Sequence, residues 1–283
     1  MPNILITGAS SGIGYATSQY LLAKGYHVFG SIRREADGKR LQQELGPGFT
    51  PLFFDVRDEA AVLAAASQVE AGWGTEGLAG LINNAGISVS GPLQHVTQEE
   101  LRQQFEVNVF GVMNVTRAFL PLLGARANCP HPPGRIIHIS SVSGRITFPF
   151  LGPYCASKHA LESLADALRR ELLPYGIDVV SIQPGAVRTP IWEKAAAQPN
   201  KYQDTDYAPY FQGLEQRVKR SYERAIPPEE IARAIGRVLE QKRPPTRIVV
   251  AHNPWMIRLL STFMPDRWLD AIAGRTLKRI RER

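Results

Sequence analysis

Short apolar runs rich in β-branched residues recur along the chain and alternate with longer amphipathic stretches. Seven such runs predict buried strands, at residues 3–7, 27–32, 50–54, 78–82, 135–141, 177–182 and 247–250. The stretches between them predict helices at residues 15–24, 59–73, 97–123, 152–174 and 228–241. Because strands and helices alternate, we expect an α/β fold in which a parallel seven-stranded sheet carries helices on both faces.

The length of the chain favours a single domain. Its 283 residues, 44% of them hydrophobic, suffice for one large core. No linker rich in glycine, serine or charge divides the sequence, although two smaller domains remain an alternative. We therefore expect one domain over residues 1–283, with a core at 3–250, a substrate lid at about 189–225 and a basic amphipathic extension at 254–283.

Charge and cysteine content limit which binding partners and which cellular compartment we expect. The formal net charge is +7, and the excess lies mostly in the last thirty residues. Such a balance fits nucleic acid, an anionic membrane or an anionic ligand. No zinc-finger spacing and no interleaved run of aromatic and basic residues occurs, so we expect neither nucleic acid nor a metal. Cys129 and Cys155 are the only cysteines and lack a C-x-x-C spacing, which suggests a reducing compartment.

The N-terminus enters the first strand almost at once, which leaves no room for a signal peptide. No apolar run reaches the ~20 residues that a membrane span needs. We therefore expect a cytoplasmic protein, and the basic tail leaves peripheral membrane contact open.

A glycine-rich turn follows the first strand and opens the first helix. Gly8 permits a tight turn, Gly12 lets the backbone approach a pyrophosphate, and Gly14 lets the helix pack closely on the sheet. A helix N-terminus also offers N–H groups and a positive dipole end to phosphate. The turn predicts dinucleotide binding; an ordinary strand-to-helix turn with spare glycines is the alternative.

Two arginines, Arg33 and Arg34, follow the second strand directly. An acid at this position of a doubly wound fold binds the ribose 2′-hydroxyl, whereas arginine accommodates a 2′-phosphate. We therefore expect NADP(H) to be preferred over NAD(H), with Arg33 as the main phosphate partner and Arg34 assisting. Two solvated loop arginines are the alternative.

Polar residues mark two further positions. Asp55 follows the third strand, where it could bind the adenine or cap the helix that starts near Asp58. Asn108 lies in the middle of a helix among apolar neighbours, where its side chain competes with helical hydrogen bonds. Asn108 therefore either has a functional role or is a core residue whose side-chain hydrogen bonds are all made within the protein.

Tyr154 and Lys158 are four residues apart at the start of the fourth predicted helix, so they lie on one face. A nearby positive charge favours the phenolate and lowers the pKa of a tyrosine. Such a pair suits proton transfer in alcohol and ketone chemistry. The spacing also occurs by chance on solvated helices.

Together these motifs resemble the short-chain dehydrogenase/reductase family. Thr7-Gly8-x-x-x-Gly12-Ile13-Gly14 and Asn83-Asn84-Ala85-Gly86 match its two cofactor motifs, and Ser141, Tyr154 and Lys158 match its catalytic residues. The similarity runs from about Asn3 to Val250 and implies a Rossmann-type doubly wound fold. It implies a dinucleotide site that contains Gly8, Ser10, Ser11, Gly12, Ile13, Gly14, Arg33, Arg34, Asp55, Val56, Asn84, Ala85, Gly86, Tyr154, Lys158, Pro184, Gly185, Val187 and Thr189.

The resemblance also implies catalytic roles. Tyr154 would be the general acid in reduction and the base in oxidation, with its pKa lowered by Lys158 and the positive nicotinamide. Lys158 would also hydrogen-bond the nicotinamide ribose. Ser141 would donate a hydrogen bond to the substrate oxygen. Asn108 would anchor a water that links Lys158 to solvent.

Apolar and aromatic residues are expected around the substrate. Together with Ser141 they include Phe148, Phe150, Leu151, Ile191 and Trp192. Such a pocket favours a bulky hydrophobic alcohol or carbonyl compound; packing of the lid on the core is the alternative. The residues around Tyr154, and Pro265-Asp266-Arg267 in the tail, are similar to a subgroup that acts on retinoids and hydroxysteroids.

The tail mixes apolar residues with arginines, a pattern typical of helices on membrane surfaces. Docking on the lid or on a partner subunit explains the same pattern and is favoured over the membrane surface. We also expect a homo-oligomer, a dimer or a tetramer. The sequence as a whole predicts an NADP(H)-dependent oxidoreductase that interconverts a hydrophobic ketone or aldehyde and its alcohol. An NAD-dependent secondary-alcohol dehydrogenase and a non-catalytic dinucleotide-binding regulator are the alternatives.

Overall fold

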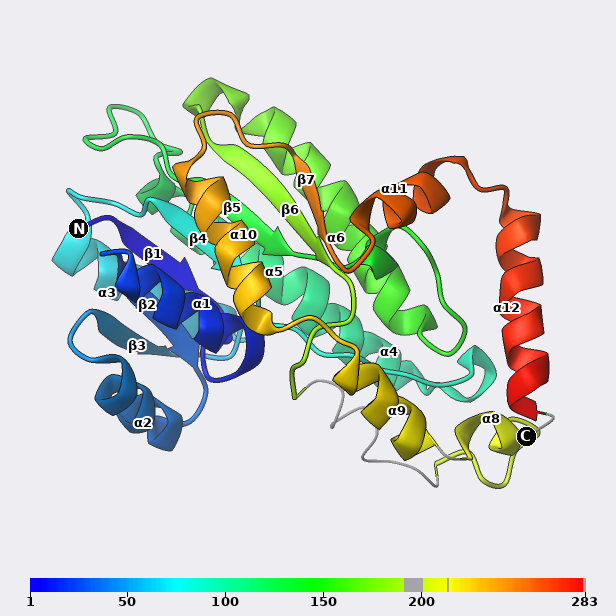
Figure 1. Ribbon diagram of the computed structural model, residues 1–283. Coiled ribbons are helices and arrows are strands. Elements are labelled where there is room, and N and C mark those ends of the chain that lie inside the picture. The colour runs from blue at the N-terminus through cyan, green and yellow to red at the C-terminus, as the bar shows by residue number, and fades with distance from the viewer. Residues whose placement is uncertain (191–200, 213, 282–283) are drawn as a thin grey trace.

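The computed structural model describes residues 1–190, 201–212 and 214–281 (Figure 1). Its strands form one parallel sheet in the order β3-β2-β1-β4-β5-β6-β7. The expected α/β fold with a parallel seven-stranded sheet is confirmed. The strands are β1 (Asn3–Ile6), β2 (His27–Ile32), β3 (Phe49–Phe53), β4 (Gly80–Asn83), β5 (Arg135–Ile139), β6 (Asp178–Pro184) and β7 (Arg247–Val250).

Helices cover both faces of the sheet, because neighbouring residues of a strand point to opposite sides. Leu5 packs on the face covered by α3, α5 and α6, whereas Ile4 and Ile6 pack on the face covered by α1, α2 and α10. These helices are α1 (Gly12–Ala23), α2 (Glu35–Leu45), α3 (Glu59–Trp73), α5 (Gly111–Phe119), α6 (Gly152–Glu171) and α10 (Pro228–Glu240).

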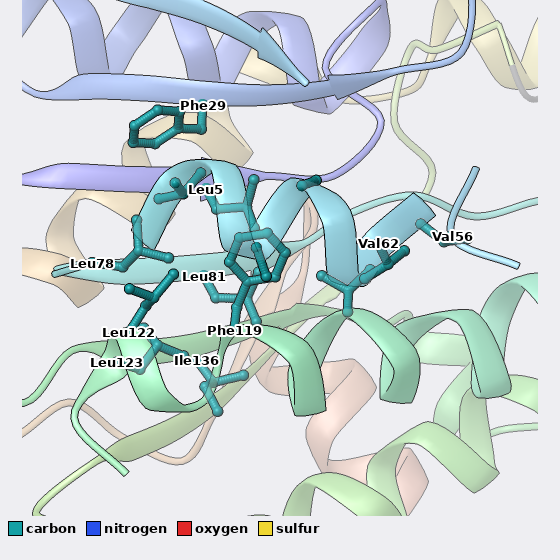
Figure 2. Close-up of a cluster of buried hydrophobic side chains, with 14 of the residues drawn as sticks. Leu5, Phe29, Val56, Val62, Leu78, Leu81, Phe119, Leu122, Leu123 and Ile136 are labelled. Carbon is teal, nitrogen blue, oxygen red and sulfur yellow. The ribbon is translucent and has the colours of Figure 1, made fainter. Parts of the chain in front are cut away.

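The first of these two cores is shown in Figure 2. Phe119 of α5 lies among side chains of the sheet that include Leu81 and Ile136, and all three are fully buried. Burial of each such side chain contributes ~1.5–3 kcal/mol. The packed layers therefore hold the carboxyl ends of the strands in a fixed arrangement, and this arrangement positions the site.

The strand order reverses at β1, which lies between β2 and β4. Ligands of open α/β sheets bind beyond the carboxyl ends of the strands at such a reversal. The glycine-rich turn follows β1, and the segment 84–86 follows β4. Both predicted cofactor motifs thus lie beside the crevice.

The single helix expected at residues 97–123 is interrupted. The structure has α4 (Gln98–Phe105), a π-helical turn η2 (Glu106–Phe110), α5 and a short 3₁₀ helix η3 (Pro121–Leu123). The wider turn contains Asn108, whose side chain bonds groups outside the helix. The pattern did not predict this turn, because the hydrogen bonds between Asn108 and Ile87 join two segments that are far apart in the chain.

Helix α2 was not among the helices expected from the pattern, and its apolar face is short, with Leu41 buried. Helix α1 begins at Gly12 rather than Tyr15. Helix α6 ends at Glu171 and is followed by η5 (Leu173–Tyr175), since Pro174 lacks the N–H that would continue the helix. Strand ends differ from expectation by one or two residues, as at β4, which begins at Gly80 rather than Leu78.

Further helices complete the fold. The short 3₁₀ helices η1 (Leu93–His95) and η4 (Val142–Gly144) lie in loops near the site. The segment expected to form the substrate lid, which we call the lid for short, holds α8 (Ala208–Phe211) and α9 (Leu214–Glu223). The tail forms α11 (Pro254–Phe263) and α12 (Asp266–Arg281), at the right of Figure 1. Among the described helices, none has the length and hydropathy of a transmembrane segment.

Candidate active site

A cavity of about 780 Å³ lies beyond the carboxyl ends of the strands. It runs from the glycine-rich turn past the end of β5 to the first turn of α6. Its lining includes most of the residues that the sequence singled out: Gly8, Ser10, Ser11, Gly12, Ile13, Arg33, Asp55, Val56, Asn84, Ala85, Gly86, Ser141, Phe148, Leu151, Tyr154, Lys158, Pro184, Gly185, Val187 and Thr189. Residues from six predicted strand ends and one predicted helix therefore converge on one space.

The shape of the glycine-rich turn depends on its three glycines. Gly8 and Gly12 have φ values of +68° and +56°, which favour glycine. A Cβ on Gly14 would lie 2.2 Å from the carbonyl oxygen of Gly8, so this glycine serves the contact between α1 and the turn rather than the cavity wall. The Ser11 side chain does not cap α1, and no acid lies in the first turn of that helix. This cradle fits the pyrophosphate of a dinucleotide.

Partly buried hydrogen bonds hold the turn against the segment after β4. The Asn84 side-chain amide donates to the carbonyl oxygens of Thr7 (2.8 Å) and Gly8 (3.1 Å). The Thr7 hydroxyl oxygen accepts from the backbone N–H groups of Asn84 (2.9 Å) and Ala85 (3.0 Å). The Gly8 N–H donates to the Ser31 hydroxyl oxygen at 3.0 Å. The turn is therefore shaped before any ligand binds.

The two arginines after β2 differ in position. Arg33 lines the cavity, with its guanidinium 3.8 Å from the carboxylate of Asp55 and largely exposed. Arg34 is the N-cap residue of α2 and does not line the cavity. Asp55 accepts hydrogen bonds from Arg57, which hold the pKa of its carboxyl below the usual range, and the nearby Arg33 adds to this effect. Asp58, and not Asp55, caps the N-terminus of α3.

The catalytic candidates meet at the other side of the cavity. The Tyr154 hydroxyl hydrogen-bonds Ser141, and the Lys158 ammonium lies 5.7 Å from the centre of the Tyr154 ring. The Lys158 ammonium donates to the carbonyl oxygen of Ile139 at 2.8 Å. The Ser143 N–H donates to the Ser141 hydroxyl oxygen at 3.1 Å, which leaves the Ser141 proton for another acceptor.

Burial dominates the protonation of this group. Desolvation raises the pKa of Tyr154, and the hydrogen bond with Ser141 opposes that rise. The expectation that Lys158 lowers the pKa of Tyr154 is therefore not met by these side chains alone. Burial also lowers the pKa of Lys158 to about 8, and the Glu162 carboxylate one turn further along α6 raises it.

Asn108 lies beneath the cavity wall and does not line the cavity. Its side-chain oxygen accepts from the Ile87 N–H at 2.9 Å, and its amide donates to the Ile87 carbonyl oxygen at 3.0 Å and to the Ser157 hydroxyl at 3.2 Å. Ile87 lines the cavity and Ser157 lies beside Lys158 on α6. Asn108 thus ties one wall of the cavity to the helix that carries the catalytic candidates.

The expected substrate residues divide into three groups. Phe148 and Leu151 line the cavity. Phe150 does not; its ring packs instead on Tyr207, Tyr210 and Phe211 of the lid, with centroid separations of 6.1, 5.6 and 5.3 Å. Ile191 and Trp192 lie outside the described residues.

Sequence reasoning missed two positioning side chains. Gln104 accepts from the Val89 N–H at 2.6 Å and donates to the Ile87 carbonyl oxygen at 3.0 Å, so it holds the same wall as Asn108 from one turn earlier. Glu162 is buried and accepts from Arg247 at 2.7 Å. The spacing of Glu162 from Lys158 was a usable signal, whereas nothing in the sequence points to its partner on β7.

Comparisons with known proteins agree with this geometry. A family model described as short chain dehydrogenase matches residues 2–200. The chain is 44% identical to an NADPH-dependent 3-dehydrocapnine reductase of Ornithobacterium rhinotracheale, covering 98% of this chain and 97% of that protein. It is 31% identical to retinol dehydrogenase 5 of Mus musculus, over 95% and 86% of the two chains. A short-chain dehydrogenase structure from Streptomyces avermitilis aligns with a TM-score of 0.75 and 27% identity, covering 98% of this chain and 95% of that one.

Proposed function

Because the chain belongs to the short-chain dehydrogenase family, and is thus an oxidoreductase of carbonyl or alcohol groups, we propose that it uses NADP(H) to interconvert a bulky apolar ketone or aldehyde and its alcohol. The observation that carries the proposal is the meeting of Ser141, Tyr154 and Lys158 in the same cavity as the glycine-rich turn. A dinucleotide, when bound, supplies or accepts the hydride. The roles below belong to this chain's own residues.

In reduction, the Tyr154 hydroxyl gives its proton to the substrate oxygen as negative charge develops there. The raised pKa of Tyr154 keeps the phenol protonated at neutral pH, so the acid is present when reduction begins. The Ser141 hydroxyl, whose oxygen already accepts from Ser143, donates its hydrogen bond to the same substrate oxygen. These two donors together fix where the substrate oxygen lies.

Lys158 stabilises the charge that forms on Tyr154. Its ammonium is held by the Ile139 carbonyl oxygen, close enough to Tyr154 to stabilise the phenolate that proton donation leaves. In the oxidative direction the same charge helps Tyr154 accept the alcohol proton. Asn108 positions this helix against the cavity wall through Ser157 and Ile87.

The preference for NADP(H) rests on Arg33. Its guanidinium lines the cavity after β2, where a 2′-phosphate of the adenosine ribose would lie. The name of the NADPH-dependent reductase that shares 44% of aligned residues supports the same preference. Arg34 occupies the N-cap position of α2 and does not line the cavity, so we assign it at most the assisting role.

An apolar substrate is favoured by the wall beyond Tyr154. Phe148 and Leu151 line it, and the aromatic cluster around Phe150 backs it. Among the described lining residues, few on this side of the cavity are charged, so a polar substrate would lose hydration without gaining partners. The retinol dehydrogenase among the relatives supports this class.

A panel of carbonyl compounds tests the proposal. Consumption of NADPH is measured with small aliphatic, long-chain, steroid and retinoid aldehydes and ketones, and each reaction is repeated with NADH. We expect turnover of the bulky apolar members and a kcat/KM that favours NADPH. A higher kcat/KM with NADH would contradict the cofactor assignment, and dinucleotide binding without turnover of any member would show a regulator instead.

A further inference from the structure

The tail presents an unusual concentration of exposed apolar side chains. Among the described residues, large hydrophobic side chains that are exposed gather in the two terminal helices: Trp255, Met256, Leu259, Phe263, Trp268 and Ile272. Trp255, Phe263 and Trp268 have exposed fractions of 69%, 75% and 66%. We call these six residues the tail face.

The tail face is the outer side of helices that are docked by their other side. Ile257 and Leu260 of α11, Met264 directly after it, and Leu269, Ala273 and Leu277 of α12 are half-buried. Helix α11 contacts β7, and α12 contacts α8 of the lid (Figure 1). Each helix therefore uses one apolar stripe for packing on the protein and keeps a second for something outside it.

Positive charge surrounds the tail face. Residues 254–283 include seven arginines or lysines against three acids. Arg258, Arg267, Arg275 and Arg279 are exposed in the structure. The Arg267 side chain is 94% exposed and lies 3.8 Å from the carboxylate of its i+3 neighbour Asp270.

We propose that the tail face docks on the surface of an anionic lipid bilayer. Tryptophan and phenylalanine side chains partition to the boundary between headgroups and acyl chains, and flanking arginines bind anionic headgroups. A second copy of this chain fits less well, because two basic tails brought face to face would repel each other. The helices would lie in the interface, since none of those described is suited to cross the bilayer.

The position of this surface relates it to the cavity. Helix α12 packs on α8, and the α8 residues Tyr210 and Phe211 pack on Phe150, the neighbour of cavity residue Leu151. Docking of the tail would therefore hold the lid side of the cavity near the bilayer. The docking itself does not depend on the proposed reaction and is measured without substrate.

Flotation with vesicles tests the docking. The full chain is mixed with vesicles of phosphatidylcholine alone or of phosphatidylcholine with phosphatidylglycerol, at low and at high salt. We expect flotation with the anionic vesicles only, and release at high salt because the charges are then screened. Failure to float with anionic vesicles at low salt, or equal flotation with neutral ones, would overturn the proposal.

A matched pair of variants places the contact. Trp255→Glu with Trp268→Glu is expected to reduce binding by at least about tenfold, since each change removes an aromatic anchor and adds repulsion. Leu63→Glu with Leu173→Glu, two exposed leucines outside the tail (52% and 68% exposed), is expected to bind like the parent. Thermal unfolding and NADPH binding check that both variants fold. Equal loss in both pairs, or an oligomer that only the tail pair dissociates without any vesicle binding by the parent, would overturn the assignment.

Discussion

The two ends of the cavity are built by different means. At the cofactor end, backbone groups and short polar side chains fix the glycine-rich turn, with Thr7, Ser31 and Asn84 holding Gly8 in place. At the substrate end, Phe148 and Leu151 line the cavity, and Phe150 between them in the sequence packs its ring on Tyr207 and Phe211. The first end suits one unchanging ligand, while the second can be altered without disturbing the first.

This difference also governs what each end requires of its sequence. A Cβ at Gly14 would lie 2.2 Å from the Gly8 carbonyl oxygen, so any other residue there would force the turn to shift. The backbone of Phe150 has a φ of +65°, a conformation that residues other than glycine rarely adopt because it is strained. The contacts of the Phe150 ring offset this strain. One end is thus limited by backbone space and the other by side-chain packing.

The largest effect is expected where the two ends meet. Tyr154→Phe removes the proton donor but keeps the ring, so turnover should fall by ~10²–10⁴-fold while NADPH affinity changes little. Single-turnover kinetics and a binding titration measure the two quantities. Tyr175→Phe, at an exposed tyrosine outside the cavity, serves as the control. If Tyr154→Phe retained more than a few per cent of the activity, another group would be the acid.

Gly14→Ala tests the cofactor end. The new methyl group would meet the Gly8 carbonyl oxygen at 2.2 Å, and overpacking of this kind costs ~1–3 kcal/mol. We expect the affinity for NADPH to fall about tenfold, whichever carbonyl substrate is used, and the unfolding temperature to be lower. Gly72→Ala in α3, where no atom lies within 4 Å of the added Cβ, should raise stability by ~0.5–1 kcal/mol and leave NADPH binding unchanged. Equal behaviour of the two variants would show that the turn adapts.

The sequence predicted the cofactor end of the cavity better than the substrate end. The turn, the strand ends and the spacing of Tyr154 from Lys158 could be predicted, because chain periodicity and fold place them together. The orientation of Phe150 toward the lid and the bond between Glu162 and Arg247 could not, since they depend on packing between segments far apart in the chain. The π-helical turn at Asn108 was missed for the same reason, as its side-chain bonds reach another segment.

Arg33→Ala compared with Arg34→Ala refines the cofactor end. Arg33 lines the cavity and Arg34 does not, so only the first change should raise the KM for NADPH, by about tenfold for the loss of one partly exposed charged contact. The KM for NADH should stay nearly constant in both variants. Initial rates at varied dinucleotide concentration provide the measurement. A larger effect from Arg34→Ala would move the phosphate partner to the other arginine.

Phe150→Ala probes the substrate end. Loss of its ring contacts, each worth ~0.5–1.5 kcal/mol, should loosen the lid and raise the KM for bulky carbonyl compounds about threefold to tenfold. The KM for NADPH and for a small carbonyl compound should not change, which makes them internal controls. Alanine is preferred to glycine because glycine would also release the backbone strain at this position. A parallel rise in the KM for NADPH would mean that the two ends are not independent.

The smallest effect is expected behind the catalytic lysine. Glu162 is the buried carboxylate that raises the pKa of Lys158, which burial lowers to about 8. Glu162→Gln removes that negative charge, so the pKa of Lys158 should fall and the lysine should lose its proton at a lower pH. Because the pKa of Tyr154 is raised, the phenol stays protonated over this range, and the alkaline limb of the kcat/KM profile should move to lower pH.

Asp166→Asn separates this charge effect from a loss of packing. Asp166 accepts from Arg247 at 2.9 Å, as Glu162 does at 2.7 Å, but it is not among the groups that shift the pKa of Lys158. Both variants therefore weaken the hold on β7, and only Glu162→Gln should shift the alkaline limb. A shift of the same size in Asp166→Asn would assign the effect to Arg247 and to the position of α6. An unshifted limb in Glu162→Gln would show that the protonation of Lys158 does not limit the reaction, and the cofactor end would then set the pH dependence without help from this helix.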